Sequence, residues 1–305
     1  IGIMKPDGSE DRSLTSRLSG GTLSWTRDGR SIVFDEPNVV SKFEFRSDLH
    51  RVDVETGRRK RLTRGLRASD PDVGPSVDGA TEEIVFVQRF PDRSELSIRA
   101  ADGNVRSLTS SAPGTEWSHP RFSPDGDAIA ASRLQGGFSD LMLVDARTGA
   151  ITPLTRDRAL DVEPAWVDGR TLIFRSDRQD KVFGLFLIGR DASALRAVAG
   201  SPRNAFTPEV DHRTSRVFFA RYSSEGYDIA SSPLAPGEAV GVYADEFPAN
   251  SEEPAPYAGE ARPYRSLPSL RPRFVSPFAE FASDEWRLGL ATASFDPLLR
   301  TTYGL

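Results

Sequence analysis

The chain has 305 residues, of which 38% are apolar, and it carries 39 Lys and Arg against 44 Asp and Glu. A net charge of −5 argues against nucleic-acid binding, because proteins that bind through phosphates usually carry a strong excess of basic residues. The absence of Cys excludes disulfides, thiolate-bound zinc and a cysteine nucleophile. No apolar run approaches the roughly 18 residues of a membrane-spanning helix. We expect no signal peptide at the strand-like residues 1–4, and we expect the chain to be a piece of a longer polypeptide.

Three markers recur in one register along the first 210 residues. Leu-Thr pairs return at steps of 48, 46 and 46 residues, and Asp-Gly pairs and single prolines keep pace with them. The Leu-Thr pairs begin at Leu14, Leu62, Leu108 and Leu154, the Asp-Gly pairs at Asp28, Asp78, Asp125 and Asp168, and the prolines are Pro71, Pro120, Pro164 and Pro208. A period of this length indicates a repeat architecture.

Residues 117–155 show the internal pattern of one unit. Strand-like segments alternate with turns that contain glycine, a residue that adopts a positive φ without steric cost. The predicted strands are residues 120–123, 128–132, 140–145 and 150–155. Four short antiparallel strands in about 44–48 residues have the size of one propeller blade.

The complete count of units predicts an all-β fold. Residues 1–15 supply only a third and a fourth strand, and a degenerate unit begins at Thr207, with residues 238–243 as its fourth strand. We therefore predict a β-propeller of four-stranded antiparallel blades, about six in number with the first incomplete, plus an extended C-terminal tail. Neighbouring blades would cover one another's apolar faces.

Composition divides the chain into three parts: a propeller at 1–244, a linker at 245–263 that is rich in Pro, Glu and Ala, and a tail at 264–305. In the tail, residues 285–295 alternate large and small apolar residues. Eleven such residues match the length of one tilted membrane β-strand. An ordinary exposed hairpin is the alternative interpretation.

Five residues lie just before the predicted first strands, where blade geometry brings them to one mouth of the central channel. They are Asp70, Trp117, His119, Glu163 and Glu209. A rim of acids, a histidine and an aromatic residue suits a protein or peptide ligand. Turn formation and capping are the alternative for each residue taken singly.

No catalytic motif occurs in the chain. The three histidines, His50, His119 and His212, fall in different units without metal-ligand spacing, and the sequence contains no G-x-S-x-G, Walker, dinucleotide-binding or EF-hand pattern. We predict no catalytic residue, no metal and no cofactor within these residues. The alternative is an accessory propeller of a hydrolase or peptidase whose catalytic domain lies outside this chain.

The repeat resembles that of TolB-type β-propellers. The resemblance rests on Ser123-Pro124-Asp125-Gly126, on DLMLVDARTG and Pro153-Leu154-Thr155, and on residues 163–166 and 174–178. It covers residues 1–244 and is specific for fold rather than function. It implies a non-catalytic propeller that docks partners at its channel mouth in the periplasm. The tail resembles the start of the outer-membrane barrel that follows such propellers in some large bacterial proteins, which implies association with the outer membrane.

Overall fold

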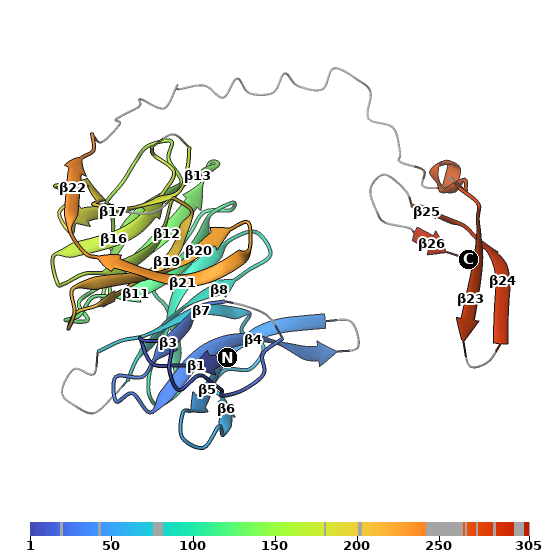
Figure 1. Cartoon of the computed structure of the whole chain (residues 1–305), viewed down its shortest axis with the longest axis horizontal. Coiled ribbons are helices and arrows are strands. Elements are labelled where there is room, and N and C mark those ends of the chain that lie inside the picture. The colour runs from blue at the N-terminus through green and yellow to red at the C-terminus, as the bar shows by residue number, and fades with distance from the viewer. Residues whose placement is uncertain are drawn as a thin grey trace. The chain divides into compact units, whose positions relative to one another are not determined.

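The computed structural model describes residues 1–18, 21–41, 44–75, 82–179, 181–200, 203–241, 265, 267–272, 274–282, 285–295 and 302–304. The chain divides into two units, Ile1–Phe247 and Pro248–Leu305. In the first unit, the described residues form five blades of antiparallel strands arranged as a propeller (Figure 1). The predicted all-β propeller is therefore confirmed, but the expected number of about six blades is wrong.

Three blades contain four strands each, in chain order. Blade one consists of β3 (Leu23–Trp25), β4 (Ser31–Ser41), β5 (Glu44–Asp53) and β6 (Arg59–Arg61). Blade two consists of β7 (Ala68–Val73), β8 (Ile84–Arg89), β9 (Ser94–Arg99) and β10 (Val105–Ser107). Blade three consists of β11 (Glu116–Phe122), β12 (Ala128–Gln135), β13 (Phe138–Asp145) and β14 (Ile151–Pro153).

The last two blades depart from four strands because one strand changes partner. Blade four consists of β15 (Asp161–Trp166), β16 (Thr171–Ser176), β17 (Gly184–Gly189) and β18 (Arg196–Val198), and β22 (Pro236–Ala239) adds to it as a fifth strand. Blade five consists, among the described residues, of β19 (Ala205–Asp211), β20 (Arg216–Ser223) and β21 (Gly226–Pro233). The prediction that residues 238–243 complete blade five is wrong for residues 238–239, which belong to β22, because β22 pairs with β18; residues 242–243 lie outside the described residues.

The half unit at the start of the chain is a two-stranded ribbon of β1 (Gly2–Ile3) and β2 (Arg12–Ser13). Ile1, Ile3 and Leu14 pack against the buried side chains of Ile32 and Phe34 in blade one. The ribbon thus covers an apolar face of blade one without forming a blade of its own.

Blades bury both faces against their neighbours. In β8, Phe86 joins a core cluster with blade one, whereas Val85 and Val87 join a cluster with blade three. This alternation follows from the period-two geometry of a strand. Blade five differs, because its second face carries the side chains of Tyr222, Tyr227 and Ile229, which are 51%, 71% and 67% exposed.

The Leu-Thr marker ties the third strand of a blade to the loop that leaves the fourth. In blade one, the Thr63 hydroxyl accepts a hydrogen bond from the Leu49 amide at 2.9 Å and donates to Asp48 at 2.7 Å. The Leu96 and Leu141 amides reach Thr109 and Thr155 in the same way at 2.9 and 3.0 Å. The threonine of the recurring Leu-Thr pair therefore stabilises each of these blades by a hydrogen bond to its third strand.

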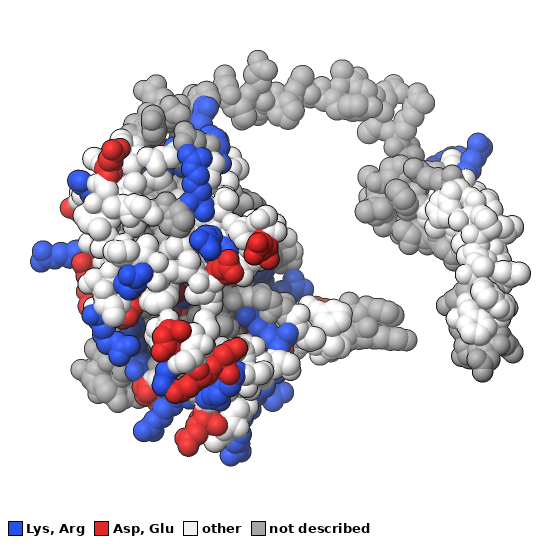
Figure 2. Space-filling model, viewed as in Figure 1, with Lys and Arg blue, Asp and Glu red and all other residues white. Residues whose placement is uncertain are grey.

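The second unit contains two small sheets. β23 (Ser276–Ala282) pairs with β24 (Glu285–Ala291), and β25 (Ala293–Phe295) pairs with β26 (Thr302–Gly304); a 3-10 helix spans Leu267–Leu270. The predicted strand at 285–295 is therefore two strands with different partners. The predicted linker at 245–263 lies outside the described residues. Figure 2 shows Lys and Arg interspersed with Asp and Glu over the visible face of the first unit. The described residues include no helix long and apolar enough to cross a membrane.

Candidate functional site

Four inner strands share one backbone irregularity at the residue that precedes the repeated proline. Asp70, His119, Glu163 and Thr207 have φ values of 51°, 50°, 56° and 47°, in the left-handed region that non-glycine residues rarely adopt. The pairing of β7, β11, β15 and β19 with the second strand shifts register at the same place. The X-Pro marker is thus a β-bulge, and a bulge redirects the side chain at its centre.

These bulges meet around one cavity of about 680 Å³, which we call the mouth cavity. Its wall includes side chains from blades one, two, three, four and five. The charged or titratable side chains are Asp70, His119, Arg121, Glu163 and Glu209, and the apolar ones include Leu23, Trp25 and Ile229. The mouth cavity therefore combines acids, a single arginine and exposed apolar side chains.

The carboxylates at two bulges connect neighbouring blades. Asp70 accepts a hydrogen bond from the His119 amide at 3.3 Å and from the Thr22 hydroxyl at 3.2 Å. Glu163 accepts from the Thr207 amide at 2.7 Å and pairs with Arg175 at 2.8 Å. Structural bridging between blades is therefore one role of both acids.

A second layer of side chains lies two residues beyond each bulge. Arg121 of blade three pairs with Glu209 of blade five at 2.5 Å and lies 3.5 Å from Asp72 of blade two. Asp72 also accepts a hydrogen bond from the Phe122 amide at 2.8 Å and one from Ser24 at 2.9 Å. This network joins four blades at the level of the channel.

The pKa values of Glu209 and Arg121, the two members of this ion pair, are shifted for different reasons. Burial raises the pKa of Glu209 above 4.5, and Asp72 adds to the rise, although Arg121 opposes it. The side chain is still 59% accessible, because it faces the cavity while surrounding protein limits the hydration of its carboxylate. Burial alone would lower the pKa of Arg121, but the neighbouring carboxylates of Glu209 and Asp72 raise it above its usual value. Glu209 is therefore the acid of the mouth cavity that a ligand can reach most easily.

The structure brings four of the five predicted site residues together. Asp70, His119, Glu163 and Glu209 all line the mouth cavity. They lie inside the first strands rather than before them.

Trp117 does not line the mouth cavity. Its side chain is 1% exposed and packs in the core cluster between blades two and three, and its indole donates to Ser111 at 2.9 Å. The register shift between Ser118 and Arg121 breaks the simple alternation of the strand, so residues two apart across it do not share a face. The prediction that Trp117 lies at the rim of the channel mouth is therefore wrong, because its side chain belongs to the core.

The histidines occupy three different settings. His119 lines the mouth cavity, and its Nδ1 is buried without a hydrogen-bond partner among the described residues. His50 is buried against Phe34, and burial lowers its pKa below 6.5. His212 lines a second cavity of about 840 Å³ that also contacts Arg121 and Glu209. Within the described parts of the chain, no cluster of three or more metal-ligating side chains is present.

Sequence reasoning missed Arg121 and the apolar wall. Arg121 stands two residues after His119, the same spacing that separates Asp70 from Asp72, so reading alternate positions beyond each X-Pro would have found it. Leu23 and Trp25 belong to blade one, which lacks the X-Pro marker. No local signal in the sequence places them at the mouth.

A known protein family matches most of the repeat region of this chain. Residues 49–240 match the family described as the TolB beta propeller domain. The chain belongs to this family. Among solved structures, TolB from Acinetobacter baumannii superposes with a TM-score of 0.62 at 18% identity, covering 78% of this chain and 59% of that one.

Peptidase-like proteins share the same propeller fold. A mutant of puromycin hydrolase complexed with PGG superposes with a TM-score of 0.55 at 17% identity, covering 96% of this chain and 45% of the hydrolase. The uncharacterized peptidase YuxL of Bacillus subtilis (strain 168) is 27% identical over 96 residues, which are 29% of this chain and 15% of that protein. The chain thus spans less than two thirds of the length of these relatives, and at these identities the structural matches show fold alone.

Proposed function

We propose that this TolB-type propeller is a non-catalytic module that binds a protein or peptide partner at the mouth cavity, in the periplasm of a bacterial cell. The observation that carries the proposal is the composition of the cavity wall. Exposed Trp25, Leu23 and Ile229 stand beside the accessible carboxylate of Glu209. Protein interfaces combine buried aromatic anchors with a polar rim in this way.

Exposure of the apolar wall supports a macromolecular partner. The Trp25 side chain is 48% exposed, and Ile229 lies on the uncovered face of blade five. Covering these side chains would remove apolar surface from water at about 25 cal/mol per Å². The acids held between blades supply a fixed polar frame, since Asp70 and Glu163 are already positioned by amides of the next blade.

The finer localisation rests on the tail. We propose that residues 264–305 begin an outer-membrane barrel and tether the propeller to that membrane. In β24, Trp286, Leu288 and Leu290 are exposed on one face of the hairpin. Alternation of this kind is typical of strands that face lipid. Additional strands would be needed to satisfy the hairpin edges inside a bilayer.

Site-specific photo-cross-linking tests the binding site. A photoreactive amino acid is placed at Trp25 or Ile229, the chain is exposed to envelope extract of the source bacterium, and adducts are identified by mass spectrometry. We expect both positions to capture the same protein. Val105, which is also exposed but lies in the outer strand of blade two, is the matched control.

A second variant links capture to the mouth cavity. Glu209→Lys reverses the charge of the accessible carboxylate and should reduce the yield of the adduct at Ile229 at least several-fold. Equal capture at Val105, or no effect of Glu209→Lys together with different proteins at Trp25 and Ile229, would reject the mouth as the binding site.

A second candidate function is an accessory role beside a hydrolase or peptidase domain outside this chain. The similarity to puromycin hydrolase, which extends over 96% of this chain, favours it. The complete reading frame decides the matter. A G-x-S-x-G motif followed by an alternating α/β pattern would support the accessory role, whereas its absence from the whole protein would leave the binding module.

A further inference from the structure

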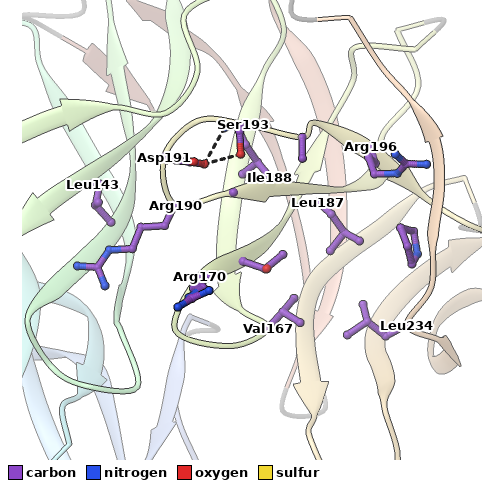
Figure 3. Close-up of a pocket in the computed structure, with 14 residues that line it drawn as sticks. Leu143, Val167, Arg170, Leu187, Ile188, Arg190, Asp191, Ser193, Arg196 and Leu234 are labelled. Atoms are coloured by element: carbon purple, nitrogen blue, oxygen red, sulfur yellow. Dashed lines mark hydrogen bonds between the residues drawn. The ribbon is translucent and has the colours of Figure 1, made fainter.

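A different cavity lies at the other end of blade four. β15 carries Glu163 of the mouth cavity near its start and leads into the turn at Val167–Arg170, and the two cavities share no lining residue. The cavity has a volume of about 910 Å³ and lies among the turns of blade four and the segment that leads into β22 (Figure 3). We call it the blade-four pocket. Its size is in the range of small-molecule sites.

The floor of the blade-four pocket is apolar. Leu187 from β17, Val167 after β15 and Leu234 before β22 face one another across it in Figure 3. Leu187 is 8% exposed and belongs to the core cluster that joins blades four and five, with Val167 and Leu234 packed against that cluster. The floor is therefore a continuation of the core that reaches the surface.

Three arginines surround this floor: Arg170, Arg190 and Arg196. Arg190 is occupied, since it pairs with Asp127 of blade three at 2.8 Å. Arg196 uses its Nε to donate to the Gly237 carbonyl at 3.0 Å. Within the described residues, the Arg170 guanidinium has no hydrogen-bond or ion-pair partner. Two arginines thus keep donors available at the rim of one apolar cavity.

Within the described residues, the single acid in the wall, Asp191, forms no ion pair with these arginines. Asp191 accepts hydrogen bonds from the amide and the hydroxyl of Ser193 at 3.1 and 2.5 Å. The turn that holds it is tightly built, because a Cβ at Gly189 would lie 2.6 Å from the Asp191 carboxylate, and Ala192 and Ala194 both have left-handed φ values of 63° and 53°. The carboxylate is therefore fixed on its own turn.

Backbone groups along the wall are also occupied. The Gly189 amide donates to the Ser193 carbonyl at 2.7 Å, and the Arg190 amide donates to the Arg170 carbonyl at 2.7 Å. An extended peptide would need free backbone partners in such a site. The wall favours instead a ligand whose body is apolar and whose only polar group is anionic.

We propose that the blade-four pocket binds a small amphipathic carboxylate, with its apolar body on Val167, Leu187 and Leu234 and its head group paired with one of the two rim arginines, Arg170 and Arg196, which lie on opposite sides of this floor in Figure 3. Arginine suits this head group, because its planar guanidinium pairs with a carboxylate through two parallel hydrogen bonds. The excess of positive charge in the wall selects against a cationic head. This site is separate from the mouth cavity and does not depend on the function proposed for it.

Binding of a matched set of probes to the whole chain tests the proposal. Octanoate, octylammonium and acetate are titrated by isothermal titration calorimetry, and ligand-induced shifts of the Gly189 and Ser193 amides are followed by NMR. We expect saturable binding of octanoate with shifts at both amides. Octylammonium, which lacks the anionic head, and acetate, which lacks the apolar body, should bind at least tenfold more weakly.

Variants test whether binding depends on the rim arginines or only on a general affinity for fatty chains. The double variant Arg170→Leu and Arg196→Leu should weaken octanoate binding at least tenfold, whereas Arg213→Leu, an exposed arginine of blade five, should leave it unchanged. Both arginines of the rim are exposed, so the fold should survive, which circular dichroism checks. Absence of saturable octanoate binding, equal binding of octylammonium, or unchanged binding by the double variant would overturn the proposal.

Discussion

Arg121 in blade three and Glu209 in blade five meet at 2.5 Å, although 88 residues separate them in sequence. Both residues line the mouth cavity and the second cavity of the channel, so their ion pair marks the boundary that the two cavities share. Asp72 stands on the other side of Arg121. The pair links the inner strands of blades that are not adjacent along the chain.

The two partners should differ in their effect on stability. Arg121→Leu leaves the nearly buried Asp72 without its cation and should lower the free energy of unfolding by about 2–4 kcal/mol. Glu209→Gln changes an accessible side chain and should alter it by less than about 1 kcal/mol. Urea unfolding at pH 7 measures both; equal losses for the two variants would contradict the asymmetry.

Asp140 should make the protein less stable as pH rises. Burial raises its pKa to about 6 from 3.8, and nearby Asp161 and Asp157 add to the rise. The folded state therefore holds this proton more tightly than the unfolded state, and the free energy of unfolding falls between about pH 4 and pH 6. Asp140→Asn keeps an acceptor for the Asp157 amide and should gain about 1 kcal/mol at pH 7, after allowance for partial exposure.

Asp48 is the matched control, because it occupies the corresponding position in blade one. Burial alone would raise its pKa, but the amides of Gly65 and Leu66, with Thr63 and Arg61, lower it below 3.8. Its ionised form therefore stabilises the fold above that pH, and the contribution is lost as pH falls. Asp48→Asn should destabilise at pH 7 and less so in acid. Parallel pH profiles for Asp48→Asn and Asp140→Asn would refute the assignment.

Two glycines in equivalent turns provide a test of blade packing. A Cβ at Gly149 would lie 2.0 Å from the Leu108 carbonyl oxygen, and φ there is 74°. Gly149→Ala should cost about 2–4 kcal/mol, the sum of backbone strain and overpacking. At Gly57 the nearest atom is the Leu14 carbonyl oxygen at 3.6 Å, so Gly57→Ala should cost about 1 kcal/mol from its left-handed backbone alone. Thermal or urea unfolding that ranks them in reverse would exclude this packing.

The sequence predicted the blades best where the repeat markers are complete. The expected strand at 128–132 lies within β12, and that at 140–145 lies within β13. The degenerate unit lacks a Leu-Thr pair, but blade four lacks one as well and still forms its fourth strand β18, so the marker alone does not decide whether a fourth strand forms. The strand β22 pairs instead with β18 of blade four, and no local pattern in the sequence predicts this long-range pairing.

The site was only partly predictable for a related reason. A residue before proline usually avoids the α regions, so the left-handed bulge at Glu163 has no simple signature in the sequence. Position relative to the proline was enough to bring Asp70 and Glu163 to the mouth. The burial of Trp117 and the arrival of Trp25 depend on packing between blades, which becomes visible only in three dimensions.

Hydrogen–deuterium exchange of the whole chain, with and without the partner captured at Ile229, tests the central claim most directly. If the mouth cavity is the binding site, the partner should slow exchange in residues 21–25, 205–209 and 226–229, and leave residues 189–196 at the blade-four pocket unchanged. Protection confined to residues away from the mouth, with the three mouth segments exchanging as in the free chain, would contradict the account.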